Sequence, residues 1–129
     1  MEKLTIIIPT FNEEDFIEGA IETSSFADEI IVIDSYSTDK TSELVKKYNV
    51  VFIQHPFENF SDQRYFAAKH ATHNMILFVD ADERISNLLK EEILAVLKKE
   101  DINSGYEIFI NVFFMGRRMK YGGFQNNWK

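Results

Sequence analysis

Four short apolar runs alternate with helix-like segments along this chain, and this alternation restricts the possible folds more than any other feature. The runs occupy residues 4–8, 30–33, 50–53 and 75–79 and are rich in β-branched and aromatic side chains. Such runs are typical of buried strands, and we expect the run at 75–79 to be buried on both faces. A helix between two strands indicates a crossover that returns the chain in a parallel direction. The sequence therefore predicts an α/β fold with a mostly parallel sheet and helices on both faces.

The segments between the runs carry the signals of strand and helix ends. The first strand should stop at Pro9, because proline cannot donate a hydrogen bond to a neighbouring strand in the middle of a sheet. Polar residues mark the expected helix ends, with Asn12, Ser61 and either Ser86 or Asn87 as caps and a second helix that ends near Tyr48. Residues 106–114 form a candidate fifth strand, and the glycines at 116, 122 and 123 suggest a turn into a short final strand.

Length and composition describe one folded domain, residues 1–129, with a formal net charge of −7 and no cysteine. The negative charge opposes binding to nucleic acid, which depends on Lys and Arg side chains that neutralise phosphates. The absence of cysteine excludes disulfides, thiolate zinc sites and a cysteine nucleophile. No segment has the length of a signal-peptide core or a membrane span, so we expect a cytoplasmic protein with at most peripheral contact with the inner face of a membrane.

The charge is unevenly distributed along the chain. Residues 1–83 carry 6 basic and 16 acidic side chains, a net charge of −10, whereas residues 84–129 carry 8 and 5, a net charge of +3. The densest basic part contains Arg117, Arg118 and Lys120. This segment is compatible with an anionic membrane surface or a phosphorylated acceptor, and equally with the solvated face of a hairpin.

Polar residues follow the predicted strands at one edge of the sheet. The segment from Pro9 to Glu13 follows the first strand, Asp34 follows the second, and Asp80 and Asp82 follow the fourth. Open α/β sheets bind ligands at the edge where the strands end. An Asp-x-Asp pair at that edge supplies two hard oxygen ligands, which suit Mg²⁺ or Mn²⁺ beside a diphosphate. The alternative is a solvated acidic turn in a chain with 21 acidic residues.

Three segments together resemble family 2 glycosyltransferases, which are inverting enzymes with the GT-A fold. They are Ile-Ile-Pro-Thr-Phe-Asn-Glu-Glu at 7–14, Val-Ile-Asp-Ser-Tyr-Ser-Thr-Asp-Lys-Thr at 32–41 and Phe-Val-Asp-Ala-Asp-Glu at 78–83. Further motifs, Phe-Ala-Asp-Glu-Ile at 26–30, Gln-Arg-Tyr-Phe-Ala at 63–67 and Asp-Ala-Asp-Glu-Arg at 80–84, resemble the branch of bacterial lipopolysaccharide core β-glucosyltransferases. The resemblance covers essentially all 129 residues.

The resemblance implies a UDP-sugar donor, Mg²⁺ or Mn²⁺, and a saccharide or lipid-linked acceptor. The implied donor-binding residues are Pro9, Thr10, Phe11, Asn12, Glu13, Asp34, Arg64, Asp80 and Ala81, and the implied metal ligands are Asp82 and Asp80.

Individual roles follow from the matching positions. Phe11 would pack on uracil, Asp34 would accept a hydrogen bond from its N3, and Arg64 would add a positive contact near the phosphates. Asp34 as a turn cap and Arg64 as an exposed helix charge remain the alternatives.

The chain departs from the family pattern in sequence and in length. His73 and Asn74 stand where Gly-Asp is common, and Tyr65 stands where Asn is common. Family members continue well beyond residue 129, with the acceptor site and the catalytic base. We therefore expect this chain to be the C-terminally truncated, donor-binding portion. We assign no catalytic base, because Glu83 belongs to the donor side.

A non-catalytic nucleotide- or Mg-binding regulatory module, such as a phospho-receiver, is the competing hypothesis. It would need acids after the first and third strands, whereas the first strand here ends in Pro9-Thr10-Phe11.

Overall fold

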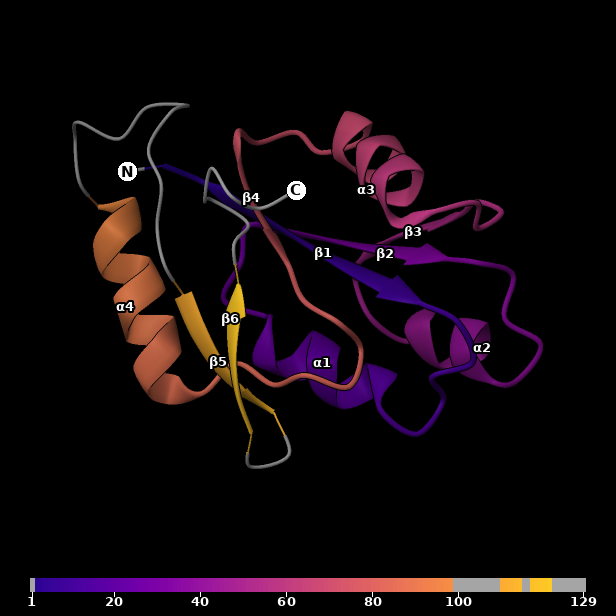
Figure 1. Ribbon diagram of the computed structural model, residues 1–129, viewed down its shortest axis with the longest axis horizontal. Coiled ribbons are helices and arrows are strands. Elements are labelled where there is room, and N and C mark those ends of the chain that lie inside the picture. The colour runs from indigo at the N-terminus through magenta and orange to yellow at the C-terminus, as the bar shows by residue number, and fades with distance from the viewer. Residues whose placement is uncertain (1, 99–109, 115–116, 122–129) are drawn as a thin grey trace.

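The computed structural model describes residues 2–98, 110–114 and 117–121 (Figure 1). Four strands form a parallel sheet in the order β3-β2-β1-β4. Their bounds are β1 Leu4–Thr10, β2 Glu29–Asp34, β3 Val51–Gln54 and β4 Met75–Phe78. The four predicted strands are therefore confirmed, with shifts of one or two residues at their ends.

Pro9 lies within β1 and does not end it, so the predicted stop is wrong. The carbonyl of Ile7 accepts a hydrogen bond of 3.0 Å from the backbone N–H of Val79, so the backbone polar groups of Ile7 face β4. The backbone nitrogen of Pro9, two residues further on, faces the same way. The last residue pair between β1 and β4 is Ile7 with Phe78, so Pro9 lies beyond the paired part of β4. Its missing N–H therefore costs no hydrogen bond between the two strands. On the other side, pairing with β2 continues to Thr10.

Four helices connect and follow these strands: α1 Ile17–Thr23, α2 Thr41–Val45, α3 Phe60–Lys69 and α4 Asn87–Leu97. The helix α2 ends at Val45, whereas the sequence predicted an end near Tyr48. A hydrogen-bonded turn follows the helix, in which the N–H of Tyr48 donates to the carbonyl of Val45 at 3.0 Å. Every predicted helix is present.

The predicted caps are correct for only one helix. The Ser86 hydroxyl accepts from a backbone N–H in the first turn of α4 at 3.1 Å, as predicted. Ser61 lies inside α3, whose cap is Asn59, and Phe16 precedes α1 with no side-chain cap at all. Asn12 adopts a φ of 53° and serves another purpose, described below.

The sheet separates two apolar layers, as the prediction of helices on both faces requires. In Figure 1, α3 lies above the strands and α1 and α2 lie below them. Ile7, Ile31 and Ile33 pack against Ala67 of α3 on one face. The opposite face of the sheet, with Ile6, Ile8 and Val32, packs against a larger core built from α1, α2 and α4.

The strand β4 forms one edge of the four-stranded sheet, so its two faces are not equally buried. Met75 and Leu77 are buried, whereas Ile76 and Phe78 are only partly buried against the smaller core. The prediction that this run is buried on both faces is therefore wrong for one face. An edge strand still places the residues that follow it at the rim of the sheet.

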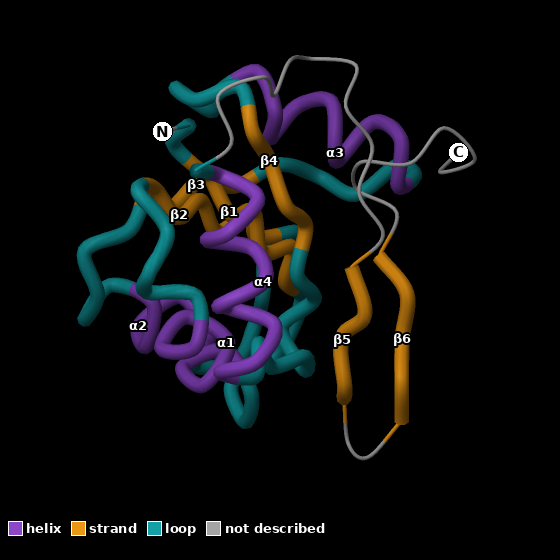
Figure 2. Tube along the Cα trace, turned by 90° about the vertical axis from the view of Figure 1, so that its left-hand side faces the viewer, coloured by secondary structure: helices purple, strands orange, loops and turns teal. Residues whose placement is uncertain are grey.

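A separate antiparallel pair, β5 Ile110–Phe114 and β6 Arg117–Tyr121, stands beside the main sheet (Figure 2). The candidate strand at 106–114 therefore includes β5, and residues 106–109 lie outside the described part. The short final strand is β6, which carries the basic residues 117, 118 and 120. Within the described residues, no helix has both the length and the apolar character needed to cross a membrane.

Candidate functional site

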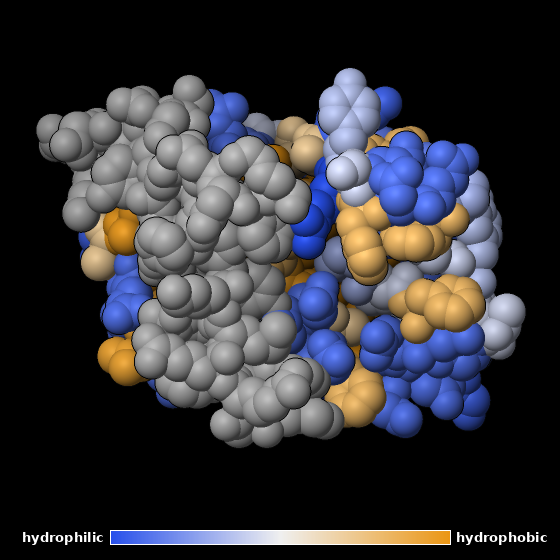
Figure 3. Space-filling view, viewed as in Figure 1, coloured by the Kyte–Doolittle hydropathy of each residue, from blue (hydrophilic) through white to orange (hydrophobic). Residues whose placement is uncertain are grey.

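A pocket of about 670 Å³ opens at the carboxyl ends of the strands. Its lining comes from the end of β1, from the loops after β1, β2, β3 and β4, and from the start of α3: Pro9, Thr10, Phe11, Glu13, Ser35, Tyr36, Pro56, Phe57, Phe60, Gln63, Asp80, Ala81 and Asp82. Figure 3 shows hydrophobic patches among hydrophilic side chains over this part of the molecule, on the right-hand side. The pocket is therefore of mixed character, as expected for a ligand with apolar and charged parts.

Seven of the predicted site residues line this pocket, and three do not. Those that line it are Pro9, Thr10, Phe11, Glu13, Asp80, Ala81 and Asp82. Asn12, Asp34 and Arg64 lie outside the lining, and each has contacts within the protein that give it a different place in the site.

Asp34 lies buried at the end of β2, and both its carboxylate oxygens are occupied. Oδ1 accepts from the hydroxyls of Thr10, at 3.0 Å, and Ser37. Oδ2 accepts from the backbone N–H of Ser37 at 2.9 Å and from the side chain of Gln54 at 3.2 Å. Four bonds use the four lone pairs of a carboxylate, so in this structure Asp34 holds the loop after β2 in place.

That loop contains Tyr36, an exposed pocket residue with a φ of 62°. A bulky residue at positive φ is strained, and such strain persists only where the surroundings fix the backbone. The hydrogen bonds from Ser37 to Asp34 fix the residue that follows Tyr36. Asn12 adds to this, since its Oδ1 accepts from the backbone N–H of Thr38 at 2.8 Å and its own N–H donates to the Ser37 hydroxyl oxygen at 2.8 Å.

The residues 80–83, here called the acidic turn, follow β4 and close on themselves. The backbone N–H of Glu83 donates to the carbonyl of Asp80 at 2.9 Å, and the N–H of Asp80 donates to Oε1 of Glu83 at 2.7 Å. Glu83 is buried, and its Oε2 has no hydrogen-bond partner in the described structure. Burial, with added repulsion from Asp80 and Asp82, raises the pKa of Glu83 to about 8.

Like charges gather around the pocket. Asp80 is exposed into it, yet desolvation by the surrounding protein raises its pKa, the charge of Asp82 adds to this, and Arg64 opposes it. The pKa of Glu13 is raised by desolvation and then by Asp82, Asp80 and Asp39. A cation between these carboxylates would relieve their mutual repulsion.

The donor set of the acidic turn fits a divalent cation that keeps open positions. In the described part of the chain, no group of three or more His, Cys, Asp or Glu side chains is arranged to hold a metal by itself. Mg²⁺ and Mn²⁺ are commonly bound by one or two carboxylates, with substrate phosphates and water completing an octahedron of oxygen ligands. Asp80 and Asp82, both in the pocket lining, would supply the protein's share of such a shell.

Arg64 lies on α3 with its guanidinium over the ring of Phe78, 5.5 Å from the ring centre. Desolvation lowers the pKa of Arg64, and the charge of Asp80 opposes that shift. It is therefore not the exposed helix charge of the alternative interpretation, but a half-buried cation within electrostatic reach of the acidic turn.

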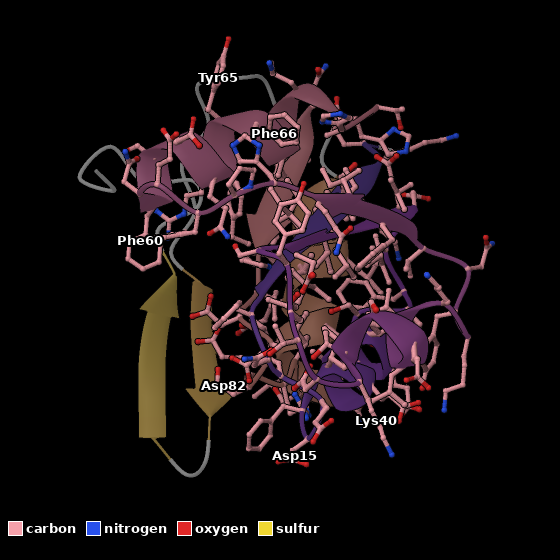
Figure 4. All side chains as sticks on the ribbon, turned by 90° about the vertical axis from the view of Figure 1, so that its right-hand side faces the viewer. Asp15, Lys40, Phe60, Tyr65, Phe66 and Asp82 are labelled. Atoms are coloured by element: carbon pink, nitrogen blue, oxygen red, sulfur yellow. The ribbon has the colours of Figure 1, made fainter. Side chains whose placement is uncertain are left out.

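Besides Tyr36, two aromatic residues of the pocket are absent from the predicted set. Phe57, in the loop after β3, and Phe60, in the first turn of α3, pack edge to face with ring centres 5.2 Å apart. They remain 48% and 66% exposed, although large aromatic side chains usually lose most of their surface on folding. Figure 4 looks onto the strand ends and shows Phe60 and Asp82 on the same side of the molecule. The only sequence signal for them is two aromatics in a loop beside a strand end.

The comparisons with known proteins agree with this geometry. The family model of glycosyl transferase family 2 matches residues 5–127. An uncharacterised glycosyltransferase of Rickettsia typhi is 32% identical over 90% of this chain and 41% of its own length. The lipopolysaccharide core biosynthesis glycosyltransferase LpsC of Rhizobium meliloti is 29% identical over 88% of this chain and 44% of its own. The chain thus spans less than half the length of these curated relatives.

Solved structures show the same fold. The crystal structure of Staphylococcus aureus TarS 1-349 in complex with UDP-GlcNAc has a TM-score of 0.58 and 30% identity, over 72% of this chain and 30% of that one. Glucosyl-3-phosphoglycerate synthase from Mycobacterium tuberculosis, in complex with Mn²⁺ and UDP-glucose, has a TM-score of 0.63 at 21% identity, over 82% and 42%. The predicted GT-A fold is confirmed. The chain belongs to glycosyl transferase family 2.

Proposed function

We propose that the pocket at the strand ends binds a UDP-sugar together with Mg²⁺ or Mn²⁺. One observation carries the proposal: Phe11, from the loop after β1, lines the same cavity as Asp80 and Asp82 of the acidic turn. An aromatic ring and a pair of carboxylates are what a nucleobase and a metal-bound diphosphate require. TarS has been crystallised with UDP-GlcNAc, which supports the assignment of the same donor class to this chain.

The residues of the pocket divide between the parts of such a donor. Pro9, Thr10 and Phe11 would hold the uracil, with the ring of Phe11, 55% exposed, available for stacking. Asn12 and Asp34 would act through the loop that they hold, and the carboxylate of Asp34 would reach the base only by giving up one of its present donors.

The charged residues of the site would serve the other end of the donor. Glu13, Asp80 and Ala81 would lie along the ribose and the phosphates, and Arg64 would add positive charge near them. Asp82 and Asp80 would ligate the metal. When bound, the cation would offset the negative charge that grows on the departing UDP.

For the whole protein we propose transfer of a sugar, with inversion, to a saccharide or lipid-linked acceptor in the synthesis of lipopolysaccharide or another cell-surface polysaccharide. LpsC, named for lipopolysaccharide core biosynthesis, and TarS, a poly(ribitol-phosphate) β-N-acetylglucosaminyltransferase, support this class of acceptor. The catalytic base and the acceptor site would be supplied by sequence that this chain does not contain. A cytoplasmic location beside the membrane remains a prediction from composition.

Nucleotide competition tests the donor assignment. Titration of the protein with UDP, CDP, ADP and GDP in the presence of Mn²⁺ should give the highest affinity for UDP, and Phe11→Ala should weaken the binding of UDP by about tenfold, because base stacking contributes on the order of 1–3 kcal/mol. Equal affinity for all four nucleotides would contradict a uridine site.

A further inference from the structure

We propose that Arg84 is a positioning residue that clamps the acidic turn onto α1 and so sets the direction of Asp80 and Asp82, and that Gly19 is required to make room for it. The inference rests on the proposed metal-assisted binding of a UDP-sugar and adds to it the device that holds the metal-ligating turn. Neither residue lines the pocket.

The guanidinium of Arg84 joins two segments of chain that are far apart in sequence. Nη1 donates to the carbonyls of Ala81, at 2.9 Å, and Glu83, at 2.8 Å. Nη2 donates to the carbonyl of Phe16 at 2.9 Å, across 68 residues of sequence. Charge-assisted hydrogen bonds of this length are about twice as strong as neutral ones, and the planar fork of arginine fixes the angle between them.

The guanidinium of Arg84, here called the clamp, binds backbone carbonyls on both sides of Asp82. Because the carbonyls of Ala81 and Glu83 are both held, the peptide unit directly before Asp82 and the one directly after Glu83 cannot rotate freely. The internal hydrogen bonds of the turn, between Asp80 and Glu83, leave its orientation relative to the rest of the protein open. The contact with Phe16 ties the turn to the segment that leads into α1, next to the hydrogen bond from the N–H of Ile85 to the Thr23 hydroxyl.

Gly19, in the middle of α1, lies directly under this guanidinium. A Cβ at position 19 would lie 2.5 Å from Nε and Nη2 and 2.6 Å from Cζ of Arg84. A glycine in the interior of a helix costs about 1 kcal/mol relative to alanine, so its presence there calls for a packing reason. The reason here is the passage of Arg84 across the helix.

These contacts make Gly19→Ala an unusually informative change. The atoms that a methyl group at position 19 would meet belong to the far end of a flexible side chain, so Arg84 would be displaced while α1 stays in place. The helix itself would gain from alanine. The variant should therefore disturb the orientation of the acidic turn without lowering the stability of the fold.

Three further variants define the role of the guanidinium. Arg84→Ala removes all three hydrogen bonds. Arg84→Lys keeps the positive charge but lacks the planar fork, so it distinguishes geometry from charge. Lys90→Ala is the matched control, because it removes one positive charge from α4, where the ammonium lies 6.0 Å from the ring centre of Phe26 and outside the turn.

Two readouts are needed, and the first requires no ligand. Hydrogen exchange of the backbone amides of residues 80–85 in metal-free protein should rise by about tenfold or more in Arg84→Ala and Gly19→Ala, and stay unchanged in Lys90→Ala. Unchanged exchange in both clamp variants would overturn the inference, whether or not the protein binds UDP.

The second readout is the affinity for UDP in the presence of Mn²⁺, measured by calorimetry together with melting temperatures. Loss of a group that orients a metal ligand commonly reduces affinity by about 10- to 100-fold, and we expect such a loss in Arg84→Ala, a smaller one in Arg84→Lys, and a loss in Gly19→Ala without a lower melting temperature. Wild-type affinity in clamp variants whose turn exchanges faster would overturn the positioning role. Failure of the wild-type protein to bind UDP with Mn²⁺ would instead contradict the proposed function, and exchange alone would then decide on the clamp.

Discussion

The side chain of Glu83 closes the acidic turn by accepting a hydrogen bond, 2.7 Å long, from the backbone N–H of Asp80. Burial of this carboxyl group, with repulsion from Asp80 and Asp82, raises the pKa of Glu83 to about 8, although the hydrogen bond from the N–H of Asp80 opposes the rise. The residue that shapes the turn is thus a third carboxyl group, which the sequence analysis placed on the donor side without giving it a role.

Glu83 should make the metal-free protein less stable as the pH rises. Its pKa is raised above the ordinary value of 4.5, so the folded state binds the proton more tightly than the unfolded state does. Its contribution is fully favourable below about pH 4.5 and is lost as the pH rises through about 8, by an amount on the order of a few kcal/mol.

Thermal unfolding between pH 5 and 9, in a chelator, measures this effect against Glu83→Gln. The glutamine keeps the acceptor for Asp80 but does not titrate, so the variant should lose much of the decline in melting temperature toward alkaline pH. Parallel curves for the two proteins would show that Glu83 does not carry the pH dependence.

Asp82→Ala should remove the metal dependence of UDP binding and leave the fold nearly as stable as before. Asp82 is a half-buried turn residue outside the apolar core, and its removal also relieves repulsion on Asp80 and Glu13. We expect a change in unfolding free energy within about 0.5 kcal/mol.

Asp15→Ala is the matched control, since it removes an exposed acid from the loop before α1 that does not line the pocket (Figure 4). It should bind UDP with Mn²⁺ like the wild type. A large fall in the melting temperature of Asp82→Ala would point to a structural role for Asp82.

Asp34→Asn should destabilise the protein by about 2 kcal/mol, because one of the two side-chain oxygens that accept four hydrogen bonds becomes an amide that cannot accept. UDP binding should weaken as well, since the loop that carries Tyr36 loses its anchor. Gln54→Ala, which removes only the 3.2 Å contact, should have a smaller effect on both. Weaker binding of UDP with an unchanged free energy of unfolding would instead indicate that Asp34 contacts the base directly.

Phe60→Ala should weaken UDP binding by about fivefold or more without loss of stability, if its exposed ring contacts the ligand. Tyr65→Ala is the control from the same helix, because the two side chains are similarly exposed, at 66% and 67%, and only Phe60 lines the pocket. Equal binding by the two variants would show that the ring of Phe60 is not part of the site.

The strands and helices could be predicted from sequence because short β-branched runs and helical periodicity are local signals. Ser86 could be predicted as a cap of α4, but the cap of α3 could not, because Asn59 and Ser61 are equally suitable in type, and only the direction in which the chain enters α3 decides between them. Asn12 shows the same limit, since its left-handed backbone depends on Thr38, which lies 26 residues away.

The site could be predicted where it follows the strand ends, as for Phe11, Asp80 and Asp82. Phe57 and Phe60 could not be predicted, because the packing of α3 against the sheet brings them to the pocket. For the same reason the saturation of Asp34 by Thr10 and Gln54 could not be foreseen, as these partners come from the neighbouring strands β1 and β3.

Calorimetric titration of the wild-type chain with UDP, with Mn²⁺ and again with a chelator, tests the central claim most directly. Without a cation, the diphosphate meets Asp80, Asp82 and Glu13 as like charges, so binding should be at least about tenfold weaker or absent. With Mn²⁺ we expect saturable binding of one UDP per chain. Binding of equal strength in the chelator would contradict the assignment of the acidic turn as a metal site.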